Sequence, residues 1–192
     1  MEALFVLLNA IAPLSPELEA YLRSIIRCKI FNPEDIILHA GQVCNHIYFI
    51  ESGWIRQFIT VDGKETTTWI LTAGDIFISV ESFFERILSE EAIQALTRLV
   101  VWGITHAELE EACRRFPEFR IHYIQIKKKY YSFSERHRKD ILSLSPEKKY
   151  AQLIENKPEI LEHVPLKHIY SYLGLSQSTF ERARRDYQSG KK

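Results

Sequence analysis

The chain has 192 residues, of which 46% are hydrophobic and 12% aromatic, and its formal net charge at pH 7 is zero. This composition argues against a disordered chain, and the length fits one large domain or a mid-sized domain with a small one. The three cysteines, Cys28, Cys44 and Cys113, are far apart. Their spacing argues against a disulfide framework, a zinc finger and an iron–sulfur site built from cysteines alone, so we expect reduced thiols.

The N-terminal segment, residues 1–20, is apolar but lacks the basic start of a signal peptide, and Pro13 and Glu17 interrupt it early. We interpret it as a short amphipathic helix. No apolar run approaches the roughly 20 residues that a membrane span needs. The sequence therefore predicts a cytoplasmic protein that does not contact a membrane.

Charge is distributed unevenly along the chain. Residues 1–126 contain 10 Lys/Arg and 17 Asp/Glu, which gives 10 − 17 = −7, whereas residues 127–192 contain 15 and 8, which gives 15 − 8 = +7. The asymmetry indicates a polyanion as the partner of the basic C-terminal third, although a basic solvated face has the same composition.

Residues 29–105 show the pattern of short strands. Runs rich in β-branched and aromatic residues alternate with turn signals, and glycines fall 12, 10 and 11 residues apart, at Gly41, Gly53, Gly63 and Gly74. This spacing predicts a compact all-β roll, barrel or sandwich. Asp62-Gly63 is a hairpin signal because both residues tolerate positive φ. The stretch 78–94 breaks the rhythm, so we expect a short helix there, where a ligand loop would lie.

Residues 106–142 turn to a helical pattern. Thr105 and Glu108 have the spacing of a capping box, and Pro117 should divide a short helix from a long one. Apolar positions then recur in steps of three and four, as in the seam of a two-helix coiled coil. The seam comprises Phe116, Phe119, Tyr123, Ile126, Tyr130 and Phe133, with His137 next in the series.

We expect this seam to pair two copies of the chain through residues 116–137. A second set of apolar residues, Ile121, Ile124 and Tyr131, lies off the seam and should pack on the β roll. The alternative is a helix packed wholly within its own chain. The presence of a second apolar stripe favours the dimer.

A small helical domain follows from residue 143 to residue 192. Ser145-Pro146 marks the start of its first helix. The stretch from residue 165 to residue 187 then fits a helix-turn-helix, in which Gly174 takes the turn and Ser176 caps the second helix. An ordinary helical hairpin with a glycine turn is the alternative.

The second helix of this motif carries polar residues at its start, the part of a recognition helix that reaches base edges in the major groove. We expect base contacts from Gln177, Ser178 and Arg182, since glutamine suits adenine and arginine suits guanine. Contacts to phosphates position a protein without reading sequence, and we expect them from Lys167, Ser176, Thr179, Arg184 and Arg185. Double-stranded DNA is thus the predicted partner.

Three segments carry a family resemblance. They are HAGQVCNHIYFIESGWIRQF at 39–58, the GDIF turn at 74–77 and the run SPEKKYAQLIENKPEILEHVPLKHIYSYLGLS at 145–176. These segments look like the cyclic-AMP receptor/fumarate-nitrate-regulator (Crp/Fnr) superfamily of bacterial regulators, and the resemblance covers nearly the whole chain.

The resemblance implies an α+β fold in three parts. A double-stranded β-helix, or jelly roll, of the cyclic-nucleotide-binding type is expected at 1–105, with the N-terminal helix. A long dimerisation helix is expected at 106–142, and a winged-helix-like helix-turn-helix domain that binds DNA at 143–192.

The effector region departs from the family pattern. Cyclic-nucleotide binders of this superfamily follow the GD turn with a Gly-Glu pair and then an Arg-Ser/Thr-Ala phosphate clamp. Here the pair reads Ile78-Ser79, and residues 89–92 read Ser-Glu-Glu-Ala without an arginine. Acidic side chains disfavour a desolvated phosphate, so we expect a divergent branch that is not controlled by cyclic AMP, with no certain cofactor. An unidentified effector would meet Ile78, Ser79, Ser82, Ser89, Ala92 and Tyr123.

These observations predict a homodimeric, cytoplasmic transcription regulator of Crp/Fnr type, with RNA polymerase as a further partner if it activates. The alternative is a small-molecule sensor with an inactive DNA-binding end, indicated by Tyr170 at a position that usually holds a small residue. Enzymatic activity is not expected, because no nucleophile, base and orienting group come together. The seven histidines are scattered without ligand spacing, so no metal site is predicted.

Overall fold

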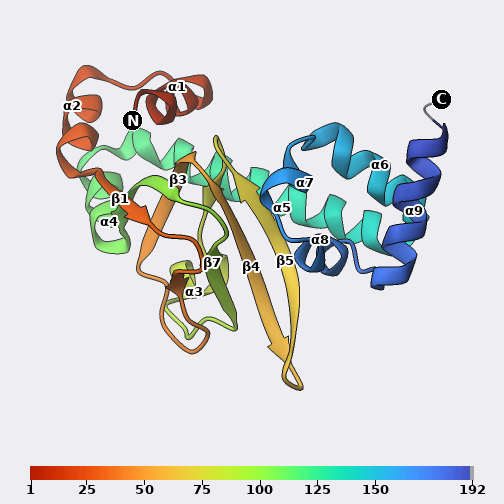
Figure 1. The fold of residues 1–192 in the computed structure, drawn as a ribbon. Coiled ribbons are helices and arrows are strands. Elements are labelled where there is room, and N and C mark those ends of the chain that lie inside the picture. The colour runs from red at the N-terminus through yellow and green to blue at the C-terminus, as the bar shows by residue number, and fades with distance from the viewer. Residues whose placement is uncertain (191–192) are drawn as a thin grey trace.

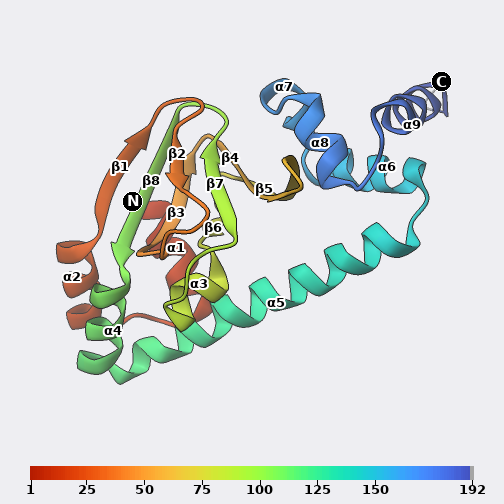
Figure 2. The ribbon, with the colours of Figure 1, turned by 90° about the horizontal axis from the view of Figure 1, so that it is seen from below.

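The computed structural model describes residues 1–190. It shows a β roll flanked by N-terminal helices, and a separate group of helices at the C-terminal end (Figure 1). The long helix α5 (Arg120–Ser143) runs along the roll and extends beyond it toward that group (Figure 2). The predicted DNA-binding domain reaches residue 192, and its last two residues lie outside the described part. No helix in the described chain is long and apolar enough to cross a membrane.

Two helices, α1 (Glu2–Ile11) and α2 (Pro16–Ile25), precede the roll. The sequence predicted one short helix here, so that prediction was incomplete. Pro13 lies in the break between them. The Ser15 hydroxyl then accepts a hydrogen bond from the Leu18 amide and starts the second helix.

The strands of the roll pair only in antiparallel fashion. They are β1 (Arg27–Phe31), β2 (Ile36–Leu38), β3 (His46–Ser52), β4 (Trp54–Val61), β5 (Lys64–Thr72), β6 (Ile76–Phe77), β7 (Glu91–Ala95) and β8 (Leu99–Thr105). They form two sheets, with the orders β1-β8-β3-β6 and β2-β7-β4-β5. Two packed sheets of this kind make the predicted jelly roll.

The roll is held by a core of aliphatic side chains from both sheets. Ile50 and Leu99 of one sheet and Ile55 and Ile93 of the other are fully buried. Each such side chain contributes about 1.5–3 kcal/mol when it leaves water. The predicted hairpin at Asp62-Gly63 joins β4 to β5, with φ values of 51° and 75°.

The helices around the roll begin where the sequence predicts. Helix α3 (Val80–Glu85) occupies the stretch that breaks the strand rhythm. Helix α4 (His106–Arg115) begins at a capping box, in which the Thr105 hydroxyl accepts the Glu108 amide and the Glu108 carboxylate accepts the Thr105 amide. The turn η1 (Pro117–Phe119) then separates α4 from α5.

The predicted seam residues of helix α5 pack against the β roll of the same chain. Phe119 is buried in the core of the roll, and Tyr123 packs edge-on against Phe84 with ring centroids 5.0 Å apart. The rings of Tyr130 and Phe133 stack on Trp69 of β5, with centroids 4.5 and 5.0 Å away. The partly buried Ile126 lies on the same side of α5. The predicted seam residues therefore pack within their own chain, which was the alternative to a contact between two copies.

The second apolar stripe of α5 faces away from the roll. Ile121, Ile124 and Tyr131 are 46%, 57% and 69% exposed, so the expectation that they pack on the roll is wrong. Both stripes have the helical period, and periodicity does not tell which of two apolar stripes a neighbouring sheet covers.

The C-terminal unit is entirely helical in the described residues. Its helices are α6 (Pro146–Asn156), α7 (Ile160–His163), α8 (Leu166–Tyr172) and α9 (Gln177–Gly190). Helix α6 starts as predicted at Ser145, whose hydroxyl accepts the Lys148 amide. No strand follows β8 in residues 1–190, so the unit has the helices of a winged helix without a β wing.

The C-terminal unit is docked on the roll. Helix α8 packs against β5, as Figure 1 shows. Trp54 and Ile70 of the roll belong to the hydrophobic cluster of the C-terminal helices. Trp54 stacks on His163 at 5.9 Å, and the Lys157 ammonium donates a 2.8 Å hydrogen bond to the carbonyl of Ile70. The position of α8 is therefore set by contacts with the roll.

Candidate nucleic-acid interface and effector pocket

Helices α8 and α9 form a helix-turn-helix around a glycine. Gly174 has a φ of +64°, in the left-handed region that favours glycine, and leads the chain from α8 toward α9. The Ser176 hydroxyl accepts a hydrogen bond from the Thr179 amide at 3.2 Å, and so caps α9. Both features were predicted from the sequence.

A small core holds α9 against its supporting helices. Phe180 and Ala183 are fully buried, and the Phe180 ring meets Tyr150 of α6 edge-on at 5.4 Å. Tyr170 is half-buried with its ring 6.2 Å from Phe180, and its carbonyl still accepts the Leu175 amide at 2.9 Å. Tyr170 is thus accommodated in this core without disrupting the turn.

The predicted base-reading residues point away from that core. Gln177, Ser178 and Arg182 are all exposed, whereas Phe180 and Ala183 of the same helix are buried. Helix α9 also lies at the end of the molecule far from the β roll (Figure 1). The start of α9 therefore presents an accessible polar surface at a helix N-terminus.

The predicted phosphate contacts differ in their accessibility. Lys167 and Arg185 are exposed, whereas Thr179 and Arg184 are half-buried. The hydroxyls of Ser176 and Thr179 lie 2.8 Å apart and hydrogen-bond to each other. Lys167 and Arg185 are consequently the more available cations of this set.

The predicted effector serines inside the roll make hydrogen bonds within the protein. Ser79, Ser82 and Ser89 are all buried, as is Ala92. The hydroxyl of Ser89 lies 2.8 Å from that of Ser79, and the Ser82 hydroxyl donates to the Ile87 carbonyl at 2.6 Å. These hydroxyls are therefore engaged within the protein rather than turned toward an open pocket.

A carboxylate lies in the region where the family places its phosphate clamp. Glu91 accepts a 3.2 Å hydrogen bond from the Thr68 hydroxyl, and burial raises the pKa of Glu91. Burial and the charge of Glu91 raise the pKa of Tyr130 on α5. A cyclic phosphate in this region would meet an acidic side chain in place of the arginine of the family's clamp.

An open cavity of about 330 Å³ lies beside this filled interior, between the roll and α5. We call it the outer cavity. Its walls are mostly apolar, from Trp69, Leu71, Ile78, Val80, Phe84 and Tyr130, and its lysines are Lys127, Lys129 and Lys157. Of the predicted effector residues only Ile78 lines it. The Lys127 ammonium lies 4.2 Å from the centre of the Phe84 ring.

Sequence reasoning missed the residues that join the two parts of the molecule. Trp69 supports α5, and Lys157 contacts the carbonyl of Ile70, 87 positions earlier, and the carboxylate of Asp75 at 3.4 Å. Contacts across such separations leave no local pattern. Within residues 1–190, no three His, Cys, Asp or Glu side chains come together as metal ligands.

Comparisons with known proteins agree with this architecture. Residues 28–116 match the family model "Cyclic nucleotide-binding domain". No curated protein matches the chain by sequence. Among solved structures, FixK2 from Bradyrhizobium japonicum is similar with a TM-score of 0.74 and 16% identity, over 86% of each chain.

Two further solved structures share the fold. The c-di-GMP responsive global regulator CLP from Xanthomonas campestris has a TM-score of 0.69 at 12% identity, over 92% of this chain and 93% of its own. A proposed transcriptional regulator of the Crp/Fnr family from Eubacterium rectale has a TM-score of 0.70 at 17% identity, over 92% and 85%.

The protein thus has the fold of Crp/Fnr-type transcription regulators, and its residues 28–116 match the cyclic nucleotide-binding domain. The resemblance noted in the sequence and the predicted fold class are confirmed, except that the described C-terminal residues carry no β wing.

Proposed function

We propose that the protein is a homodimeric transcription regulator that binds double-stranded DNA through α9. The observation that carries the proposal is the exposed first part of α9, where Gln177, Ser178 and Arg182 are accessible to solvent while Phe180 and Ala183 are buried against the supporting helices. A helix supported in this way and capped at a glycine turn is suited to the major groove. The units of this proposal are 1–105 for effector binding, 106–142 for dimerisation and 143–192 for DNA binding.

Base and phosphate contacts are proposed to be made by different residues. Gln177, Ser178 and Arg182 would read base edges, because their side chains carry the donors and acceptors that bidentate recognition uses. The phosphate contacts are proposed for Lys167, Ser176, Thr179, Arg184 and Arg185. Neutralising phosphates releases counterions, so this part of the binding should depend strongly on salt.

The dimer contact is proposed on the exposed side of α5. We name Ile121, Ile124, Tyr131 and Leu142 the outer stripe; all four are exposed, by 46% to 74%. They are separated by 3, 7 and 11 positions, which keeps them on one side of a helix, as in a heptad seam. The stripe predicted from the sequence is already packed on Trp69, so the outer stripe is the surface left for a second copy.

In such a dimer two copies of α9 would enter successive major grooves roughly 34 Å apart and read a near-palindrome. The protein would act in the cytoplasm, and on RNA polymerase if it activates. Control by a small effector is proposed at the outer cavity, because the interior of the roll is filled. No enzymatic role is proposed.

The experiment is a selection of bound duplexes from a random pool, read by gel shift at a stated salt concentration. We expect a consensus of two half-sites separated by one helical turn. Enrichment of no sequence, combined with a ligand-dependent melting shift, would instead support a sensor of the same fold with an inactive DNA-binding end.

A further inference from the structure

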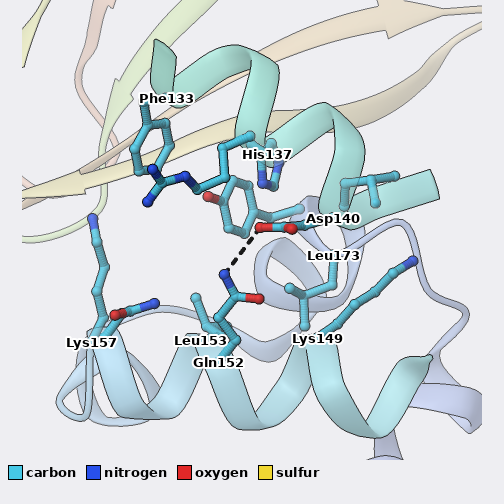
Figure 3. A pocket seen from close by; sticks show the side chains of 12 residues that line it. Phe133, His137, Asp140, Lys149, Gln152, Leu153, Lys157 and Leu173 are labelled. Carbon is cyan, nitrogen blue, oxygen red and sulfur yellow. Dashed lines mark hydrogen bonds between the residues drawn. The ribbon is translucent and has the colours of Figure 1, made fainter. Parts of the chain in front are cut away.

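A second cleft, which we call the hinge cleft, opens between α5 and the C-terminal unit. It has a volume of about 320 Å³ and is lined from α5, α6 and the end of α8. Figure 3 looks into it, with Phe133 and His137 projecting from α5 and Gln152 and Leu153 from α6. Its size is that of a small-molecule site, for which about 300–1,000 Å³ is usual. It lies apart from the exposed side of α9 and from the interior of the roll.

One wall of the hinge cleft is a row of flat rings. The His137 imidazole stacks on Tyr172 of α8, with centroids 4.2 Å apart and an interplanar angle of 10°. Phe133 continues the row at 6.4 Å and 20°. Burial lowers the pKa of His137, which favours the uncharged form of its ring. An aromatic ligand can pack against such a row, either stacked or edge-on. The apolar side chains of Leu153 and Leu173 also line the cleft beside it.

The polar groups of the cleft carry an excess of positive charge. Arg136, Lys149 and Lys157 line it, and Asp140 is the only carboxylate among its lining residues. Asp140 already accepts a 3.0 Å hydrogen bond from the Gln152 amide. In the described chain, the side chains of Arg136 and Lys149 make no hydrogen bond or ion pair, although Lys149 is only 9% exposed. An unpaired arginine beside an apolar wall favours an anion.

We propose that the hinge cleft binds a small aromatic anion, a planar ring system that carries one carboxylate or sulfonate. The ring would pack against Phe133 and His137. The anionic group would meet Arg136, which follows Phe133 by three positions and so shares its side of α5. Lys157 lies at the same end of the cleft as Phe133, and Lys149 lies at the other end (Figure 3).

Such a ligand would join two parts of the molecule. Phe133 and Arg136 belong to α5, whereas Tyr172 and Leu173 end the first helix of the helix-turn-helix. A bound anion would therefore hold the helix-turn-helix on α5. The proposal rests on the cleft alone, so it holds whether or not α9 binds DNA, and it is tested without DNA.

The test is isothermal titration calorimetry of the full chain with 2-naphthoate. We expect one site per chain, and binding at least about tenfold weaker for the uncharged 2-naphthylmethanol, which cannot form an ion pair with the Arg136 guanidinium. Cyclohexanecarboxylate, which has the charge without the aromatic ring, should also bind more weakly. A dissociation constant for 2-naphthoate above about 1 mM would overturn the proposal.

Matched variants locate the site. Arg136→Gln should weaken 2-naphthoate about tenfold, whereas Arg138→Gln, on the same helix but paired with Glu135 at 3.0 Å, should not. Asn156→Trp, at an exposed lining position, should fill the cleft and abolish binding. Unchanged binding in Arg136→Gln would contradict the proposal even if Asn156→Trp fails to fold. Loss of binding in Ile11→Trp, which fills the outer cavity, would place the ligand there instead.

Discussion

The backbone amide of Thr67 on β5 donates a 3.0 Å hydrogen bond to the hydroxyl of Ser171 on α8, 104 positions later. Ser171 lies three residues before Gly174, so this bond ties the start of the turn directly to the β roll. The carbonyl of Ser171 also accepts the Gly174 amide at 3.0 Å. Ser171 is therefore one of the contacts that couple the direction of α9 to the roll.

We expect Ser171→Ala to weaken the docking of the C-terminal unit. Thr67 is 3% exposed, so its amide would lose its partner in buried surroundings, which costs about 1–3 kcal/mol. Faster hydrogen exchange at the Thr67 amide would report the loss directly. Ser189→Ala is the matched control, because that hydroxyl donates to the Arg185 carbonyl on an exposed helix end. Equal effects of the two variants would show that the Thr67 contact does not hold the unit.

The docked interface should also respond to pH through His168. Its side chain is 6% exposed, and burial, with the nearby charges of Arg56 and Lys167, lowers its pKa from 6.5 to about 4, while Glu65 acts in the opposite direction. A neutral histidine is thus favoured in the folded chain. Its contribution to stability is present above pH 6.5 and is lost progressively as pH falls from 6.5 toward 4.

Between pH 7 and pH 5 this loss should reach about 2 kcal/mol in the free energy of unfolding. His168→Gln should remove that share of the pH dependence in urea titrations at the two pH values. His39→Gln, at an exposed histidine, should keep it. A wild-type pH dependence that persists unchanged in His168→Gln would show that another group carries it.

The sequence was most informative where structure depends on neighbouring residues. The capping box at Thr105, the hairpin at Asp62-Gly63 and the glycine turn at Gly174 are each set by a few adjacent side chains, and each was predicted. The exposure of the start of α9 also followed, because the spacing of Phe180 and Ala183 fixes which side of that helix is buried.

Contacts between distant segments were not predictable in the same way. Two apolar stripes on α5 satisfied the same helical period, and contacts with distant residues such as Phe84 and Trp69 decide which stripe is covered. The effector residues were predicted from the pattern of the family. In the structure, the hydroxyls of Ser79 and Ser89 hydrogen-bond to each other instead of facing an open pocket. The outer cavity and the hinge cleft depend on how α5 crosses the roll, which no local motif encodes.

The outer stripe gives a direct test of the dimer. Ile124→Glu places a charge within the proposed contact, and we expect it to convert the dimer to a monomer in sedimentation or light-scattering measurements. A desolvated, unpaired charge in an interface costs several kcal/mol. Gln125→Glu, the next residue and also exposed, carries the same change in charge off the stripe and should leave the dimer intact. A dimer that persists in Ile124→Glu would argue for a different contact surface.

The two classes of proposed DNA contact should separate in salt titrations. Lys167→Ala removes a phosphate contact, so it should weaken all sequences alike and lower the slope of log affinity against log salt by about 0.9 per protomer. Arg182→Ala should leave that slope nearly unchanged and reduce the preference for the selected site by about 1–3 kcal/mol per protomer. Lys64→Ala, at an exposed position on the β4–β5 hairpin, controls for a general change in charge. If Arg182→Ala lowers the slope and spares the preference, then Arg182 contacts phosphate, and the base-reading surface of α9 must lie nearer Gln177 and Ser178.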